Sequence, residues 1–204
     1  AEWYNDDQMS KLETYEHDVL NGPTKEWYES GELEMTGKYK NGKKHGMFTE
    51  YYESGAVESI YLYNNDVPHG SRIEWHENGK CKFSGRYVNG KFHGECLDWY
   101  DSGWRKSSCN YANGVAYGRY VEWFDGFDEV LHYEYVSNGV YHGKCRSYSI
   151  GSDGYSIICT YQCTYIYGIE FDVVVRNADG IDIERRNPSC AYILSLPFDS
   201  LGGG

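Results

Sequence analysis

Residues 38–55, which read KYKNGKKHGMFTEYYESG, contain the pattern that decides the fold of this 204-residue chain. The stretch places an Asn-Gly pair at Asn41, a His-Gly pair at His45 and a Glu-Ser-Gly triplet at Glu53. Asn-Gly and Ser-Gly supply the positive φ angles that tight hairpin turns require. The runs between these signals are short and rich in tyrosine, threonine and phenylalanine, which is typical of β-strands. The stretch therefore predicts strands joined by tight turns.

The same pattern recurs along the chain with a period of 24 or 25 residues. Its most regular marker is a glycine, found at Gly22, Gly46, Gly70, Gly94, Gly118, Gly143 and Gly168. Five positions later stands an aromatic residue: Trp27, Tyr51, Trp75, Trp99, Trp123 or Tyr148. The residue just before the aromatic one is acidic: Glu26, Glu50, Glu74, Asp98 or Glu122. Self-similarity at a fixed period is the signature of a repeat architecture.

With two turn signals in every repeat, the chain has no room for a helical period. We therefore predict an all-β fold, an elongated single-layer ribbon of about seven to eight β-hairpins in which each repeat contacts only its neighbours. Ser10 and Glu13 resemble a helix-capping pair. However, Glu2-Trp3-Tyr4 lies 24 residues before Glu26-Trp27-Tyr28, so we assign this segment to the repeats as well.

The predicted domains are a repeat array over residues 1–168 and a degenerate hairpin with a C-terminal cap or tail over 169–204. The predicted repeats are 1–21 (partial), 22–45, 46–69, 70–93, 94–117, 118–142 and 143–167. Because the first repeat is partial, we expect a longer array in the full gene product. The apolar run 191–198 is expected to fold over the last strand and cover its edge.

A two-residue loop at the Glu-Ser-Gly turn would place the second residue after each repeat glycine opposite the fifteenth. The pairs expected from this register are Phe48 with Tyr61, Tyr120 with Tyr133, Cys96 with Cys109, and Cys145 with Cys159 if one residue is inserted. Similar residues face each other in these pairs, which favours cross-strand packing.

The composition excludes several classes of function. The net charge is −12, from 19 basic and 31 acidic residues, which is the wrong sign for binding nucleic acid and disfavours anionic membranes. The 22 tyrosines and 6 tryptophans argue against a disordered chain. We find neither an apolar stretch long enough to span a membrane nor a signal peptide at the start. These features favour a location in the cytoplasm or within a viral or host-cell assembly.

The unit Gly-x-x-x-Glu-(Trp/Tyr)-Tyr-Glu-(Ser/Asn)-Gly, followed by Tyr-x-Asn-Gly-Lys-x-His-Gly, resembles the MORN repeat (membrane occupation and recognition nexus). The closer likeness is to its longer variant, which occurs in bacterial and large-virus proteins. The likeness covers residues 2–143 well and 144–168 loosely. Proteins of this family serve as scaffolds, assembly platforms and partner-binding ribbons, and the resemblance supplies no catalytic residue.

Cysteines, histidines and acidic residues offer alternative sites. Cys96 with Cys109, and Cys145 with Cys159, either form cross-strand disulfides or remain packed free thiols; directly opposite Cβ atoms lie about 4.5–5.5 Å apart, wider than a relaxed disulfide. The histidine column (His45, His69 and His93) and the acidic column have a repeat spacing of roughly 10 Å, too wide for shared metal coordination or a carboxylate pair in catalysis. We therefore expect no metal, no cofactor and no catalytic residue.

The aromatic and acidic columns are the candidate partner-binding residues: Trp27, Tyr51, Trp75, Trp99, Trp123, Glu26, Glu50, Glu74, Asp98 and Glu122. The aromatic column has three interpretations, namely packing between repeats, a docking groove, or a platform for carbohydrate. The hypothesis we favour is a non-enzymatic scaffold that presents an aromatic and acidic surface to a protein partner or to a second copy, within a larger viral or bacterial assembly. Membrane binding, and an enzyme with a site in residues 144–198, are the alternatives.

Overall fold

The computed structural model describes residues 1–5 and 7–126 with their side chains, and beyond them the backbone of strands within 130–137, 140–141, 143–150, 157–166, 169–176 and 182–186. The chain divides into two compact units, Ala1–Trp104 and Arg105–Gly204. All regular structure in the described residues is β-strand, which confirms the predicted all-β fold.

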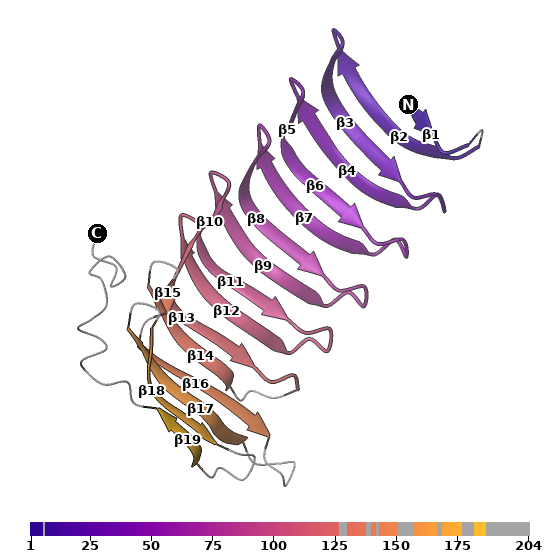
Figure 1. Cartoon of the computed structure of the whole chain (residues 1–204). Coiled ribbons are helices and arrows are strands. Elements are labelled where there is room, and N and C mark those ends of the chain that lie inside the picture. The colour runs from indigo at the N-terminus through magenta and orange to yellow at the C-terminus, as the bar shows by residue number, and fades with distance from the viewer. Residues whose placement is uncertain are drawn as a thin grey trace. The chain divides into compact units, whose positions relative to one another are not determined.

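Unit 1 is an open antiparallel sheet in which the strands follow one another in chain order (Figure 1). The short strands β5 and β10 pair back onto β4 and β9. The strands are β1 (Glu2–Trp3), β2 (Met9–Glu16), β3 (Val19–Trp27), β4 (Leu33–Lys40), β5 (Lys43–Lys44), β6 (Gly46–Tyr51), β7 (Val57–Asn64), β8 (Val67–Trp75), β9 (Cys81–Val88), β10 (Lys91–Phe92) and β11 (Gly94–Trp99). The predicted hairpin meander is thus confirmed.

Unit 2 continues the pattern with antiparallel pairs in chain order, and β15 pairs back onto β14. Its strands are β12 (Arg105–Ala112), β13 (Val115–Trp123), β14 (Val130–Ser137), β15 (Val140–Tyr141), β16 (Gly143–Ile150), β17 (Ile157–Ile166), β18 (Ile169–Arg176) and β19 (Asp182–Arg186). The predicted cap at 191–198 lies outside the described residues.

The Asn-Gly signals form two-residue turns, as predicted. At the first of them Asn41 and Gly42 have φ angles of 52° and 78°, and Lys40 lies opposite Lys43. Positive φ at both central residues is the mark of a type I′ turn, whose twist matches that of the strands it joins. His17-Asp18 and Asn65-Asp66 adopt positive φ at both positions without a glycine.

The Glu-Ser-Gly turn differs from the prediction, because its loop has three residues instead of two. The Tyr52 N–H donates to the Ala56 carbonyl at 2.8 Å, and the Gly55 N–H donates to the Tyr52 carbonyl at 2.8 Å. A β-bulge next to the loop puts an extra residue, Glu58, into β7. The bulge restores the register, so Phe48 lies opposite Tyr61 as expected.

The repeat glycines occupy a second irregularity, at which the register shifts by two residues. Tyr39 lies opposite Lys44, whereas Thr36 lies opposite Thr49. Gly46 stands at this shift with φ +84°, a conformation that favours glycine. Bulges bend the strand that carries them, and the strands of unit 1 are visibly curved in Figure 1. In unit 1 the regular glycine column therefore reflects a bend in the repeats.

A single sheet layer leaves little room for a dry core. The buried hydrophobic residues in the described part are Phe48, Cys96, Cys109 and Val121. The Phe48 ring is 2% exposed and packs edge-on against Tyr39 and Tyr63, with ring centroids 5.6 Å and 5.3 Å apart. Packed aromatic rings therefore join the strands of unit 1, beside the hydrogen bonds of the strand ladders.

Two predicted pairings in unit 2 are wrong. Tyr133 lies opposite Val121 instead of Tyr120, because this repeat has one residue more between its strands. Cys145 lies opposite Cys163, and Cys159 opposite Tyr148. Strands β16 and β17 continue to Ile150 and Ile157 before the loop, which moves the turn away from Cys145 and breaks the 24-residue register.

Candidate interaction faces

The alternation of side chains along a strand separates the two predicted columns. Consecutive residues of a strand point to opposite faces of the sheet. In unit 1 this puts the aromatic column on one face, here called the Trp face, which carries Trp27, Tyr51, Trp75 and Trp99. The other face, here called the Glu face, carries Glu26, Glu50, Glu74 and Asp98. The single aromatic and acidic surface expected from the sequence is therefore two surfaces.

The Trp face carries rings that are neither fully buried nor fully exposed, since all four column residues are half-buried. Around them stand apolar side chains that are open to solvent: Leu12 is 42% exposed, Met47 57% and Leu62 37%. Met47 lies directly opposite Leu62, so these two form one apolar pair on the face. The Trp face therefore combines half-buried rings with exposed apolar side chains.

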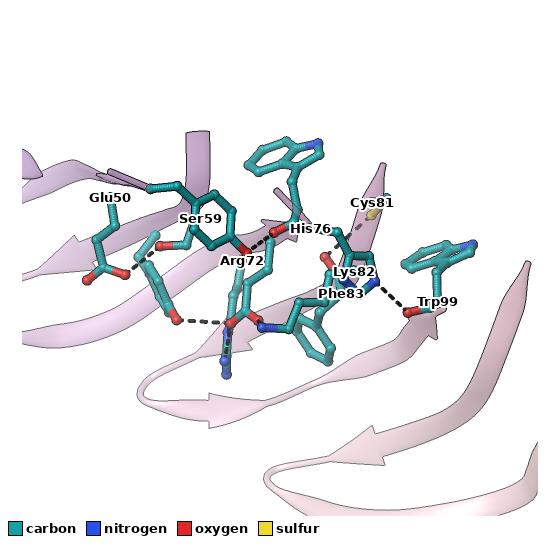
Figure 2. Close-up of polar contacts among 12 residues, drawn as sticks. Glu50, Ser59, Arg72, His76, Cys81, Lys82, Phe83 and Trp99 are labelled. Carbon is teal, nitrogen blue, oxygen red and sulfur yellow. Dashed lines mark hydrogen bonds and ion pairs between the residues drawn. The ribbon is translucent and has the colours of Figure 1, made fainter. Parts of the chain in front are cut away.

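The residue that follows the aromatic column residue forms a hydrogen bond to the next repeat. The Tyr28 hydroxyl donates to the Tyr51 carbonyl at 2.7 Å, and the Tyr52 hydroxyl donates to the Trp75 carbonyl at 2.7 Å. His76 makes the equivalent contact, with its Nε2 atom 3.0 Å from the Trp99 carbonyl (Figure 2). Because a carbonyl only accepts, His76 Nε2 carries the proton here. These residues recur every 24 positions in the sequence.

The Glu face holds its carboxylates in specific contacts. Glu26 forms an ion pair with Lys11 at 3.2 Å, and Glu50 accepts a hydrogen bond from the Ser59 hydroxyl at 2.6 Å. Asp98 lies opposite Phe83 on the same face. Glu26, Glu50 and Asp98 thus stand in separate repeats, on β3, β6 and β11.

Arg72 is the best-packed cation of the Glu face. Its guanidinium forms an ion pair with Glu74, hydrogen-bonds to the Tyr87 hydroxyl at 3.1 Å, and lies over the rings of Tyr61 and Phe83 at 5.1 Å and 4.8 Å (Figure 2). Burial alone would lower the pKa of Arg72, but the contacts with Glu74 and Tyr87 outweigh it and raise the pKa. The site holds the charged guanidinium by a carboxylate, a hydroxyl and ring faces.

Unit 2 shows the same alternation between Glu122 and Trp123 in β13. The Trp123 ring is half-buried, and the Arg105 guanidinium lies over it at 5.3 Å. Tyr120 donates a hydrogen bond to Glu122. The candidate residues of unit 2 therefore also engage in local contacts, which fits the packing interpretation of their columns.

The cysteines and potential metal ligands add no reactive site to the described residues. Cys81, Cys96 and Cys109 carry free thiols, and burial raises the pKa of the Cys81 and Cys109 thiols. A raised pKa leaves less of the nucleophilic thiolate at neutral pH. No group of His, Cys, Asp or Glu within residues 1–5 and 7–126 is arranged to hold a metal ion. The described part of the chain also has no helix with the length and apolar character needed to cross a membrane.

The fold and its faces define a class of protein, an open β-repeat sheet whose two faces carry different side chains. The family model of the MORN repeat variant matches residues 20–41, 44–65 and 92–113, which confirms the resemblance: the chain carries MORN-variant repeats. MORN repeats are generally modules that interact with proteins or membranes, and the family is typically non-enzymatic. No match was found among the curated proteins.

Proposed function

We propose that this protein is a non-enzymatic interaction scaffold that binds a protein partner through the Trp face. The observation that carries the proposal is the row of half-buried rings at Trp27, Tyr51, Trp75 and Trp99, flanked by exposed apolar side chains. Large aromatic side chains contribute most of the binding energy in many protein interfaces, particularly when a rim of other contacts excludes water.

A protein partner fits this surface better than a membrane does. The net charge of −12 opposes approach to anionic lipid, whose attraction depends on clustered lysine and arginine. The Trp face also offers rings in a regular row, which suits an extended protein surface that contacts several repeats at once. Such a row serves a scaffold in a larger assembly, since each repeat adds an equivalent contact.

The experiment begins by finding the partner through the face itself. A photo-crosslinking amino acid placed at Met47 reports on the Trp face, and one placed at exposed Ser54 in the Glu-Ser-Gly loop serves as the control. We expect a discrete adduct from the Met47 position in extracts of the native source. The partner identified in this way is then purified and its affinity measured by titration calorimetry.

Variants of the aromatic column decide between the interpretations. Trp75→Ala and Trp99→Ala, each shown to be folded by circular dichroism, should weaken the partner at least about tenfold, corresponding to a loss of about 1.4 kcal/mol or more per ring. Glu53→Gln is the control at an exposed position in the Glu-Ser-Gly loop and should change the affinity less than twofold. Unchanged affinity in both tryptophan variants would overturn the proposal and leave the column a packing feature.

A further inference from the structure

A cavity on the Glu face remains without a role in the function proposed above. It has a volume of about 270 Å³ and lies over β3, β4, β6 and β7 in unit 1. Its lining includes the carboxylates of Glu26, Glu34, Glu50 and Glu58 and the rings of Tyr28 and Tyr39. This volume is several times the roughly 30 Å³ that one water molecule occupies in the liquid. The cavity can therefore admit a side chain.

The charges around the cavity are unbalanced. Glu26 is paired with Lys11, but Glu34 and Glu58 form no ion pair with any residue of the described chain. Lys44 also lines the cavity, yet its ammonium group lies over the rings of Phe48 and Tyr63, at 4.8 Å and 5.2 Å from their centroids. The excess of carboxylates makes the cavity attractive to a cation.

The titration of a cavity tyrosine agrees with this charge balance. Burial, followed by the negative charges of Glu34 and Glu58, raises the pKa of Tyr28. A tyrosine near carboxylates resists losing its proton because the phenolate would be repelled by them. The cavity therefore has a negative potential that a positive side chain would relieve.

The protein itself shows which group this environment binds. Glu74 and Tyr87, which contact the guanidinium of Arg72, stand 48 residues after Glu26 and Tyr39 in the same repeat positions. At the position of Arg72, however, the earlier repeat has Thr24, which brings no charge. The cavity thus keeps the carboxylate and the hydroxyl of the Arg72 site, and its Glu26 is paired instead with Lys11.

A second difference between the two repeats also adds negative charge to the cavity. Lys82, whose ammonium lies 3.8 Å from the Glu74 carboxylate, corresponds to Glu34 two repeats earlier. The later site is therefore neutralised by Arg72 and Lys82 from within the chain (Figure 2), while the earlier one has a threonine and a third carboxylate in their place. Within the described residues no ion pair neutralises Glu34 or Glu58, so a cation for these two carboxylates has to come from outside.

We propose that this cavity receives a lysine or arginine side chain of the protein partner, held by the Glu34 and Glu58 carboxylates and the faces of Tyr28 and Tyr39. The inference rests on the proposed function only in taking the cation from a protein. Carboxylates combined with aromatic faces bind ammonium and guanidinium groups strongly where water is partly excluded. The Glu face then selects basic segments, while the Trp face supplies apolar contact.

The test uses small probes and needs no partner. Nα-acetyl-arginine methylamide and Nα-acetyl-lysine methylamide are titrated into the full chain at low ionic strength, with binding followed by ¹H–¹⁵N NMR. The uncharged Nα-acetyl-norleucine methylamide is the ligand control. We expect saturable shifts at the amides of β3, β4 and β6 with the charged probes only. Equal shifts with norleucine, or no saturable shifts up to tens of millimolar, would overturn the proposal.

Variants separate the cavity from the general negative field of the chain. Glu34→Gln with Glu58→Gln should weaken the charged probes at least about fivefold. Glu29→Gln with Glu95→Gln changes the net charge equally at two exposed positions and should weaken them less than twofold. Glu34→Lys copies Lys82 and should abolish binding. Equal weakening by both double variants would show a field effect alone and refute the site.

The two proposals can fail separately. If the probes do not bind but Trp75→Ala and Trp99→Ala still weaken the partner, the scaffold function stands and the cation site is wrong. If the probes bind and the tryptophan variants have no effect, the Trp face is wrong as the docking surface. Both proposals are wrong if the charged probes do not bind and the tryptophan variants do not weaken the partner.

Discussion

The contact between Phe48 and Gly37 allows a sharp prediction about what stabilises the sheet. A methyl group added at Gly37 would lie 2.3 Å from two carbons of the Phe48 ring, far inside van der Waals contact. Because this ring is 2% exposed and closely packed, it cannot move aside without disturbing Tyr39 and Tyr63. Overpacking of this kind costs about 1–3 kcal/mol. The reduced entropy of the unfolded chain offsets roughly 0.4–1 kcal/mol of that cost.

We therefore expect Gly37→Ala to lower the free energy of unfolding by about 1–2 kcal/mol, measured by urea denaturation followed by circular dichroism. Phe48→Leu shortens the obstructing side chain, so Gly37→Ala should cost less than about 0.5 kcal/mol in that background. Gly85→Ala should cost less free energy of unfolding than Gly37→Ala, since its methyl would lie farther from its neighbours, 2.8 Å from Phe83 and 3.0 Å from the Cys96 sulfur. If Gly37→Ala costs the same with phenylalanine or leucine at 48, the ring is not the obstacle and the reasoning fails.

Three further predictions concern single side chains. Thr24 is 1% exposed and its hydroxyl has no hydrogen-bond partner. Thr24→Val should therefore be neutral or stabilising in thermal unfolding, whereas Thr24→Ser should cost about 1 kcal/mol. A loss of stability above about 1 kcal/mol in Thr24→Val would contradict this. Asp18→Gly should raise the melting temperature, because Asp18 has φ +61° in a type I′ turn and glycine adopts that angle without strain. A lower melting temperature in this variant would contradict the prediction. Burial raises the pKa of Tyr61 to about 12, so its contribution to stability is complete below pH ~10 and is lost as the pH rises towards ~12. The melting temperature of the native chain should then fall more steeply over this range than that of Tyr61→Phe, and parallel curves would count against the assignment.

Much of unit 1 could be predicted from the sequence because its signals are local. Asn41-Gly42 encodes a type I′ turn within two residues, and the structure has that turn. The pairing of Phe48 with Tyr61 also followed from the repeat register. The two-residue period of a strand puts Glu26 and Trp27 on opposite faces of the sheet, although the acidic and aromatic columns were predicted to form one surface.

The failures have a common physical cause, which is that register depends on the sum of every loop and bulge between two strands. The three-residue loop at Glu53 and the bulge at Glu58 compensate each other, so the error in the turn did not show in the pairing. Between β16 and β17 the bulge next to Ser147 does not restore the predicted register, and Cys145 faces Cys163. A single inserted residue changes every partner in a strand pair.

The sequence by itself determined the repeat period, the all-β class, the tight Asn-Gly turns and the acidic character, since each depends on residues close together in the chain. Only the tertiary structure decided that Phe48 covers Gly37, that Arg72 is held by Glu74 and Tyr87, and that a cavity remains two repeats earlier at Glu26 and Tyr39. These features depend on which side chains of different strands meet across a bent sheet. Each of these contacts joins side chains from different strands, so the sequence of one repeat alone does not specify it.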